Sequence, residues 1–329
     1  MSFFAVLFAL LIEQLKPLPS RNPVHHSLSG WVRWVGRNFD AGAPTHARVV
    51  WGITVLAPAL LIGLIYVALN RYSTVLALAW DVVVLYMTLG FRQFSHHFTD
   101  IRDALDQARE DRARELLAHW RHVDASDLPR AELLRHVIEY SLLAAHRHVF
   151  GGFFWFVVLS TLGLGPMGAV LYRMAEFTSR YWSYKSHVTG TATHHGLLAL
   201  SSRLFMWIDY VPARLTAFGF AVVGNFEEAI ESWRRHASLW RHSNEGIILA
   251  SAAGAVGVRL GGQAAPGAGK DVSRTLSEGD SPETGDAVGS TGGVPPQMDH
   301  LRNIVALIWR SVVLWLLLLA LLSLANLIG

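Results

Sequence analysis

The chain contains no cysteine, and only 16% of its 329 residues are charged. Without cysteine it can hold no disulfide bond, thiol nucleophile, iron–sulfur cluster or zinc ribbon. Soluble domains have about 25% charged residues, so this low content indicates a membrane environment for much of the chain. A hydrophobic content of 52% excludes disorder of the whole chain. The net charge of +3 is small and predicts no nucleic-acid partner.

The hydrophobic residues are concentrated in runs long enough to cross a bilayer as helices. A hydrocarbon core of about 30 Å needs roughly 20 residues of helix. The runs are 49–69, 74–91, 149–174, 204–224 and 304–328. Buried helices of a large soluble protein are the alternative, but five such runs would need far more polar sequence to cover them. We therefore predict an all-α fold, a polytopic membrane helix bundle in contact with membrane lipid.

The third run is interrupted by the sequence GLGPMG at 163–168. Gly and Pro break a helix at membrane depth only where protein or water satisfies the freed backbone groups. If this run crosses fully, Arg180, Lys185 and Arg203 lie outside the cell, against the positive-inside rule. If the chain turns back at GLGPMG, they stay inside, and we favour this re-entrant interpretation. The apolar stretch 2–12 has no basic segment before it and no cleavage site after it, which favours an interfacial helix over a secretory signal.

The charged segments set the expected orientation and the cytoplasmic insertion. Only residues 70–73 join the first two runs, so the flanking segments 13–48 and 92–148 lie on one side of the membrane. Both are rich in arginine, which predicts that this side is the cytoplasm. Within 92–148 we expect two amphipathic helices, the second capped by Ser126 or Asp127 with Pro129 in its first turn.

These features divide the chain into five segments. They are an N-terminal segment with the first membrane hairpin, the cytoplasmic amphipathic helices, a core membrane or re-entrant region, a flexible linker rich in Gly, Pro and Ser, and a C-terminal transmembrane helix: 1–91, 92–148, 149–260, 261–303 and 304–329. The linker contains GAGK at 267–270. It is not a phosphate loop, because the first Gly and the final Ser or Thr of that motif are missing and no strand precedes it.

Polar residues inside apolar runs are the first candidates for function, because a charge at membrane depth is costly. Asp209 and Arg214 stand five residues apart around Pro212, so a broken helix can present both to one cavity. A buried structural ion pair is the alternative. The 16 histidines include adjacent pairs, which point about 100° apart on a helix, and no HExxH sequence is present. We expect no metal site built from histidine.

Two stretches resemble signatures of the CobD/CbiB family, membrane proteins of cobalamin synthesis that join an aminopropanol arm to cobyric acid. They are YVPARLT at 210–216 and NEGIILASAAGAVGVRLGG at 244–262. Weaker matches at the family's spacing are Pro23–Val24, Glu139, Phe154–Trp155, Tyr172 and Tyr184. The resemblance covers nearly the whole chain except the linker.

The chain departs from the family pattern at several polar positions. Ala144 and Arg147 stand where the family has Asn and Asp, and Glu176 and Ser179 replace another Asn and Asp. Such losses are typical of a divergent homologue with altered or lost catalysis. The chain also resembles AmpE, an inner-membrane factor linked to β-lactamase induction, through the pattern WxDxVPxRL at 207–215. AmpE lacks a clear GVRLGG end, which favours CobD/CbiB.

The resemblance implies an ATP-dependent amide-forming ligase of the bacterial inner membrane, with ATP and Mg²⁺ required and a corrinoid as substrate rather than cofactor. By this resemblance the catalytic residues are Glu139, Glu176, Asp209 and Arg214, and the substrate-binding residues are Asn244, Arg259, Gly261 and Gly262. The acidic groups would hold Mg²⁺ or accept the amine proton, and the arginines would hold phosphate charge. The glycines of 254–262 allow either close approach of a ligand or close helix packing.

Two other functions stay open. A non-catalytic membrane regulator like AmpE predicts an altered cell-wall stress response with unchanged corrinoid content. A structural protein that holds other membrane or cobalamin-pathway proteins predicts co-purification with them.

Overall fold

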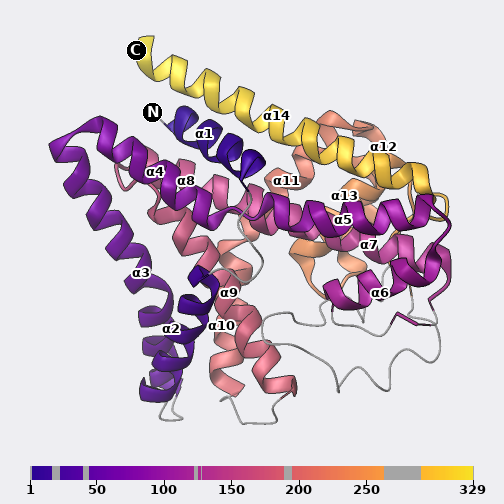
Figure 1. The fold of residues 1–329 in the computed structure, drawn as a ribbon, viewed down its shortest axis with the longest axis horizontal. Helices are drawn as coiled ribbons and strands as arrows, with labels where there is room; N and C mark the ends of the chain where they lie inside the picture. The colour runs from indigo at the N-terminus through magenta and orange to yellow at the C-terminus, as the bar shows by residue number, and fades with distance from the viewer. Residues whose placement is uncertain are drawn as a thin grey trace. The chain divides into compact units, whose positions relative to one another are not determined.

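The computed structural model describes residues 2–16, 23–39, 44–121, 125–126, 128–188, 195–262 and 290–328. Within these ranges the regular structure is helical (Figure 1), and β-structure is limited to two isolated bridges, Val258 with Val294 and Gly261 with Ser290. The predicted all-α class is confirmed. The GAGK sequence, most of the predicted linker and the proposed cap Asp127 lie outside the described residues.

Within the described ranges, three helices are long and apolar enough to cross a membrane: His46–Tyr72, Arg130–Thr161 and Met298–Ala325. The chain is therefore a polytopic helical membrane protein. The first contains the predicted run 49–69, and the third contains residues 304–325 of the predicted run 304–328. The predicted run 204–224 is not one helix, because it is divided at Asp209 into α10 (His195–Ile208) and α11 (Tyr210–Val223).

The chain forms two compact units, which are described one at a time. Unit 1 comprises Met1–Gln93, Arg147–Asp209 and Trp315–Gly329. Unit 2 comprises Phe94–His146 and Tyr210–Leu314.

In unit 1 a bundle forms around α9 (Met167–Val188), which packs on α3 (Pro44–Tyr72), α8 (Gly151–Thr161) and α10. In addition, α2 (Pro23–Phe39) lies along α3 (Figure 1), and α1 (Ser2–Leu15) packs on α4 (Thr74–Thr88). The core lies where α2, α3, α9 and α10 meet, and it includes Val35, Val50, Phe177 and Trp182. One face of α9 is therefore anchored in apolar packing.

The helix break expected within GLGPMG is present at residues 162–166, between α8 and α9. Gly163 and Gly165 have φ values of 77° and 55°, which favour glycine. A Cβ on Gly165 would also lie 2.4 Å from the ring of Tyr66. Since α8 and α9 pack against each other, the two helices form a hairpin. Its placement in the lipid stays a prediction.

Unit 2 contains most of α5 (Phe91–Asp106), α6 (Glu110–Arg121), α7 (Arg130–Ala145), α12 (Phe226–His236), α13 (Ser243–Val256) and the first half of α14 (Met298–Ile328), together with α11. The prediction of two amphipathic helices in 92–148 is wrong. The described residues of this region form three, because α5 ends at Asp106 and Ala108 adopts a φ of 55° before α6 begins. The cap of α7 is Pro129 rather than Ser126, and most residues of α7 are buried.

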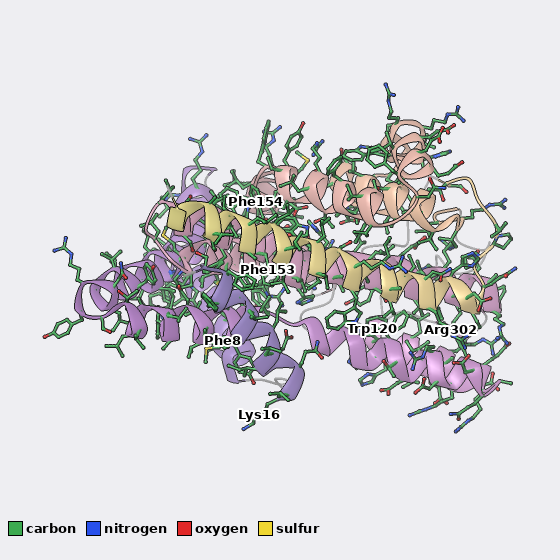
Figure 2. All side chains as sticks on the ribbon, turned by 90° about the horizontal axis from the view of Figure 1, so that it is seen from above. Phe8, Lys16, Trp120, Phe153, Phe154 and Arg302 are labelled. Carbon is green, nitrogen blue, oxygen red and sulfur yellow. The ribbon has the colours of Figure 1, made fainter. Side chains whose placement is uncertain are left out.

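Aromatic and capping contacts hold the helices of unit 2. Trp120 of α6 stacks on His97 of α5 and meets Tyr140 of α7 edge-on. Figure 2 marks the position of Trp120. The side chain of Asn225 caps α12 by accepting a 3.3 Å hydrogen bond from the N–H of Glu228. The helix α12 carries acidic residues in its first turn and basic residues in its last, which complements its dipole.

Candidate functional site

A buried carboxylate on α7 holds the glycine-rich end of the 244–262 motif in unit 2. The Glu139 side chain is 0% exposed, and its Oε1 accepts a 2.7 Å hydrogen bond from the backbone N–H of Gly261, 122 positions away. Nη1 of Arg135 lies 3.4 Å from the same oxygen. Because Arg135 is also buried, Glu139 compensates a charge that would be costly alone. The structure thus brings the predicted residues Glu139 and Gly261 together.

The segment around Gly261 is irregular, and a second stretch of chain secures it. The N–H of Arg259 donates to the carbonyl of Val294, and the N–H of Thr291 donates to the carbonyl of Leu260, each at 2.8 Å. The N–H of Leu260 donates in turn to Oγ1 of Thr291 at 2.8 Å. The side chain of Arg259 is exposed. The backbone of this segment is therefore fixed, while its arginine faces the surface of the unit.

The guanidinium of Arg214 on α11 reaches the start of α13. Its Nη1 donates to Oδ1 of Asn244 at 3.4 Å and to the carbonyl of Tyr210 at 2.8 Å. The guanidinium carbon also lies 3.3 Å from the ring centroid of Tyr210. Stacking and two hydrogen bonds orient this side chain. The predicted residues Arg214 and Asn244 thus form a second contacting pair.

Close helix packing explains part of the small-residue stretch. A Cβ on Gly254 would lie 2.2 Å from the backbone oxygen of Glu228, so α12 and α13 approach closely there. The hydroxyl of Ser251 donates to the carbonyl of Ala217 at 2.7 Å, which ties α13 to α11. Of the two interpretations of these glycines, the structure supports packing at Gly254.

In unit 1, Glu176 lies among arginines. The carboxylate is 0% exposed, with Oε2 at 3.0 Å from Nη1 of Arg173 and Oε1 at 2.5 Å from Nε of Arg180. Arg147 also interacts with it electrostatically. Burial raises the pKa of Glu176, but the positive charges of Arg180, Arg173 and Arg147 outweigh burial and lower the pKa below its usual value.

Asp209, also in unit 1, occupies the break between α10 and α11. It is 5% exposed, and its Oδ1 accepts a 2.8 Å hydrogen bond from the hydroxyl of Tyr172 on α9. The end of α10 is held in place because the indole N–H of Trp155 donates to the carbonyl of Ile208 at 3.0 Å. A buried carboxylate thus lies at a helix end, where it accepts a hydrogen bond from a tyrosine hydroxyl.

The predicted site residues are distributed over both units. Glu176 and Asp209 belong to unit 1, and Tyr172 interacts electrostatically with both. The other six belong to unit 2: Glu139, Arg214, Asn244, Arg259, Gly261 and Gly262. Among the residues that the structure describes, no three His, Asp or Glu side chains form a group able to hold a metal ion.

Sequence reasoning missed the cationic partners of the two buried glutamates. Arg173, Glu176 and Arg180 follow an i, i+3, i+7 spacing on one helix, a readable signal of a shared face. Arg135 likewise precedes Glu139 by four residues. The contact of Tyr172 with Asp209 spans 37 positions and has no local signal.

Comparison with known proteins places this chain in a family. The model of the CobD/CbiB protein family matches residues 5–290. A cobalamin biosynthesis protein CobD of Stutzerimonas stutzeri is 31% identical over 96% of both chains. One of Chromobacterium violaceum is 34% identical over 78% of this chain and 80% of its own. No solved structure shows a significant match. The extent of the family match and the identity over nearly full length show that the chain belongs to the CobD/CbiB family of cobalamin biosynthesis proteins.

Proposed function

We propose that this chain is a working ligase that attaches an aminopropanol arm to cobyric acid by ATP-dependent amide formation. The observation that carries the proposal is the hydrogen bond between Glu139 and Gly261, which joins two motif positions that are far apart in the sequence. Similarity to CobD proteins along 96% of the chain supports it.

ATP transfers phosphate to a carboxylate oxygen of the corrin substrate, so this oxygen can leave as part of the phosphate. The amine nitrogen attacks the carboxyl carbon, the C–N bond forms as the C–O bond breaks, and the amine proton passes to a base or to water. Cations that hold the developing phosphate charge lower the barrier. Arg214, oriented by Tyr210 and Asn244, and the exposed Arg259 are suited to this role.

The carboxylates differ in how well they fit Mg²⁺. Mg²⁺ in nucleotide sites is bound through one or two carboxylates and the substrate phosphates. Glu139 and Glu176 are fully buried and each is paired with arginine, so neither is well suited to Mg²⁺. Asp209 stays a candidate for Mg²⁺ by the family resemblance alone. We assign Glu139 to positioning the 257–262 segment.

Complementation in a bacterium whose own gene of this family is deleted tests the function. The wild-type chain should restore growth on cobyric acid, and corrinoid extracts should contain the amide product. A chain that is expressed in the membrane yet leaves the strain dependent on cobinamide would refute catalysis. If the strain stays dependent on cobinamide and also shows an altered cell-wall stress response, a non-catalytic membrane regulator is favoured.

Arg214→Lys is the sharpest variant for this assay. Lysine keeps the charge but loses the planar group that stacks on Tyr210 and bonds Asn244, so complementation should fall at least tenfold. The matched control is Arg235→Lys, an exposed arginine of the same unit paired only at the surface with Glu231. Equal activity of the two variants would contradict the role of Arg214.

We further propose that the chain lies in the bacterial inner membrane with segment 92–148 in the cytoplasm. The absence of cysteine makes labelling of single introduced cysteines direct. Tyr72→Cys, at the exposed turn between α3 and α4, should react with an impermeant maleimide added to intact cells that have a permeable outer membrane. Gln107→Cys should react only after lysis; labelling in intact cells would refute the orientation. Association with other cobalamin-pathway proteins stays a prediction.

A further inference from the structure

A cavity lies between α3 and α10 in unit 1. Its volume is about 360 Å³, which is within the range of small-molecule binding pockets. The cavity is lined by two residues of α3 and four of α10: Ala47, Arg48, Gly196, Ala199, Leu200 and Arg203. None of the predicted catalytic or substrate-binding residues lines it.

The helices on both sides of the cavity are fixed by packing. The helices α3 and α10 contact each other, and each of them also packs on α9. Ala47 and Leu197, the residue after Gly196, both belong to the apolar core of unit 1. A Cβ on Gly196 would meet no neighbouring group within 4 Å, so space remains beside that residue. The backbone around the cavity is therefore held in place while the cavity itself stays open to a ligand.

The charge of the cavity comes from Arg48 and Arg203, which are both exposed. Over the described part of the chain, neither guanidinium forms a hydrogen bond or an ion pair. No described residue that lines the cavity is acidic. Two cations that line one cavity repel each other, and an anion placed between them is attracted by both.

The chemistry of the lining indicates the kind of anion. A guanidinium presents its N–H donors in a planar fork that matches the oxygens of a phosphate group. The remaining lining includes the apolar side chains of Ala47, Ala199 and Leu200. Two arginines beside apolar side chains suit a phosphate group that is attached to an apolar body.

The position of the cavity along α3 indicates what this apolar body is. Arg48 is the third residue of the membrane-crossing segment His46–Tyr72, so its Cα lies within about 3 Å of the end of that segment. The headgroups of a bilayer lie at this depth, and basic pockets between membrane helices bind anionic headgroups. From the next residue onward, exposed apolar side chains follow one side of α3 at i, i+7 and i+11: Val49, Leu56 and Leu60. An acyl chain can lie along this stripe.

We propose that Arg48 and Arg203 bind the phosphate group of an anionic phospholipid. The headgroup occupies the cavity between α3 and α10, and an acyl chain follows the stripe on α3. A lipid bound in this way bridges the two helices and stabilises their packing. The proposal is independent of the ligase function, because it involves none of the residues assigned to that reaction.

Lipid titration tests the site with the full-length protein in a nonionic detergent, and native mass spectrometry counts the bound lipids. Phosphatidylglycerol should bind at least tenfold more tightly than phosphatidylcholine of the same chain length. Arg48→Gln and Arg203→Gln should each weaken phosphatidylglycerol binding about fivefold, because each removes one cation beside the headgroup. The matched control is Arg71→Gln, an exposed arginine at the opposite end of α3, which should bind like the wild type.

Ala199→Trp keeps the test decisive if an arginine variant fails to fold. This substitution at an exposed position fills the cavity and leaves both charges in place, so it should also weaken phosphatidylglycerol binding at least fivefold. That loss separates binding in the cavity from general attraction to a basic surface. A folded Ala199→Trp protein that binds like the wild type would overturn the proposal, as would equal affinity for the two lipids.

A competition arm identifies the source of the phosphate. Inorganic phosphate at millimolar concentration should not displace phosphatidylglycerol, because it lacks the acyl chains that lie along α3. Displacement by inorganic phosphate, lost in the Arg48→Gln and Arg203→Gln variants, would assign the cavity to a soluble phosphate compound and refute the lipid.

Discussion

Substitutions of Glu139 test whether its carboxylate stabilises the fold or acts only in catalysis. Glu139→Gln retains an oxygen that can accept from the N–H of Gly261 but removes the charge that faces the buried Arg135. Glu139→Ala removes both. The matched control is Glu132→Gln, because Glu132 also contacts Arg135 but its side chain is 32% exposed.

The expected magnitudes follow from burial. A hydrogen bond to a charged group is worth about 1.5–3 kcal/mol, and this is the expected loss in unfolding free energy for Glu139→Gln. Leaving Arg135 without this partner and the N–H of Gly261 without an acceptor should make Glu139→Ala cost about 3–5 kcal/mol. The Glu132 carboxylate is partly exposed and Arg135 keeps Glu139 as a partner, so Glu132→Gln should cost only about 0–1 kcal/mol.

The assay is denaturant unfolding in micelles followed by tryptophan fluorescence, with hydrogen exchange of residues 257–262 as a local readout. Exchange in that segment should accelerate in Glu139→Ala and little in the Glu132 control. If Glu139→Ala unfolds within about 0.5 kcal/mol of the wild type, the clamp is refuted. Loss of amide formation in that stable variant would then assign Glu139 a direct catalytic role.

Three further predictions concern packing, a buried hydrogen bond and pH. Gly254→Ala should destabilise the protein by about 1–3 kcal/mol in the same unfolding assay, because the added methyl group meets the backbone of α12. Gly152→Ala is the control and should not destabilise the protein, because a Cβ at that position meets no neighbouring group within 4 Å. Tyr172→Phe should lower the unfolding free energy by about 1–3 kcal/mol, since the buried Asp209 loses its hydroxyl partner; an unchanged thermal midpoint would contradict this. The pKa of Glu176 is lowered in the folded state, so the ionised carboxylate stabilises the protein above its ordinary pKa of 4.5. This stabilisation is lost as the pH falls through the lowered pKa. The thermal midpoint of Glu176→Gln should therefore fall less steeply than that of the wild type below about pH 4.5.

Local sequence determined the class of the protein and many of its helix limits. The apolar runs at 49–69 and 304–328 exceed the length of a bilayer crossing, so any fold must bury them in lipid or protein. Gly163 and Gly165 ended a helix where expected, because their backbone conformation is accessible to glycine. The motif residues YVPARLT and GVRLGG also indicated the family before any fold was known.

Some local features could not be predicted from the sequence pattern. The helix break at Ala108 is not marked by a glycine or a proline in the sequence, because an alanine adopts the positive φ there. Asp209 reads as a charge inside a continuous apolar run, yet it occupies a helix break and is held by a tyrosine from another helix.

Only the tertiary structure decided which polar groups meet. The contact of Glu139 with Gly261 links residues 122 positions apart, and no helical periodicity relates positions at that separation. Arg147 acts electrostatically on Glu176, which Arg173 and Arg180 contact, although Arg147 belongs to a different helical segment of unit 1. Sequence spacing fixes neighbours along one helix, but the compensation of buried charge depends on how different helices pack, and that is a property of the folded chain.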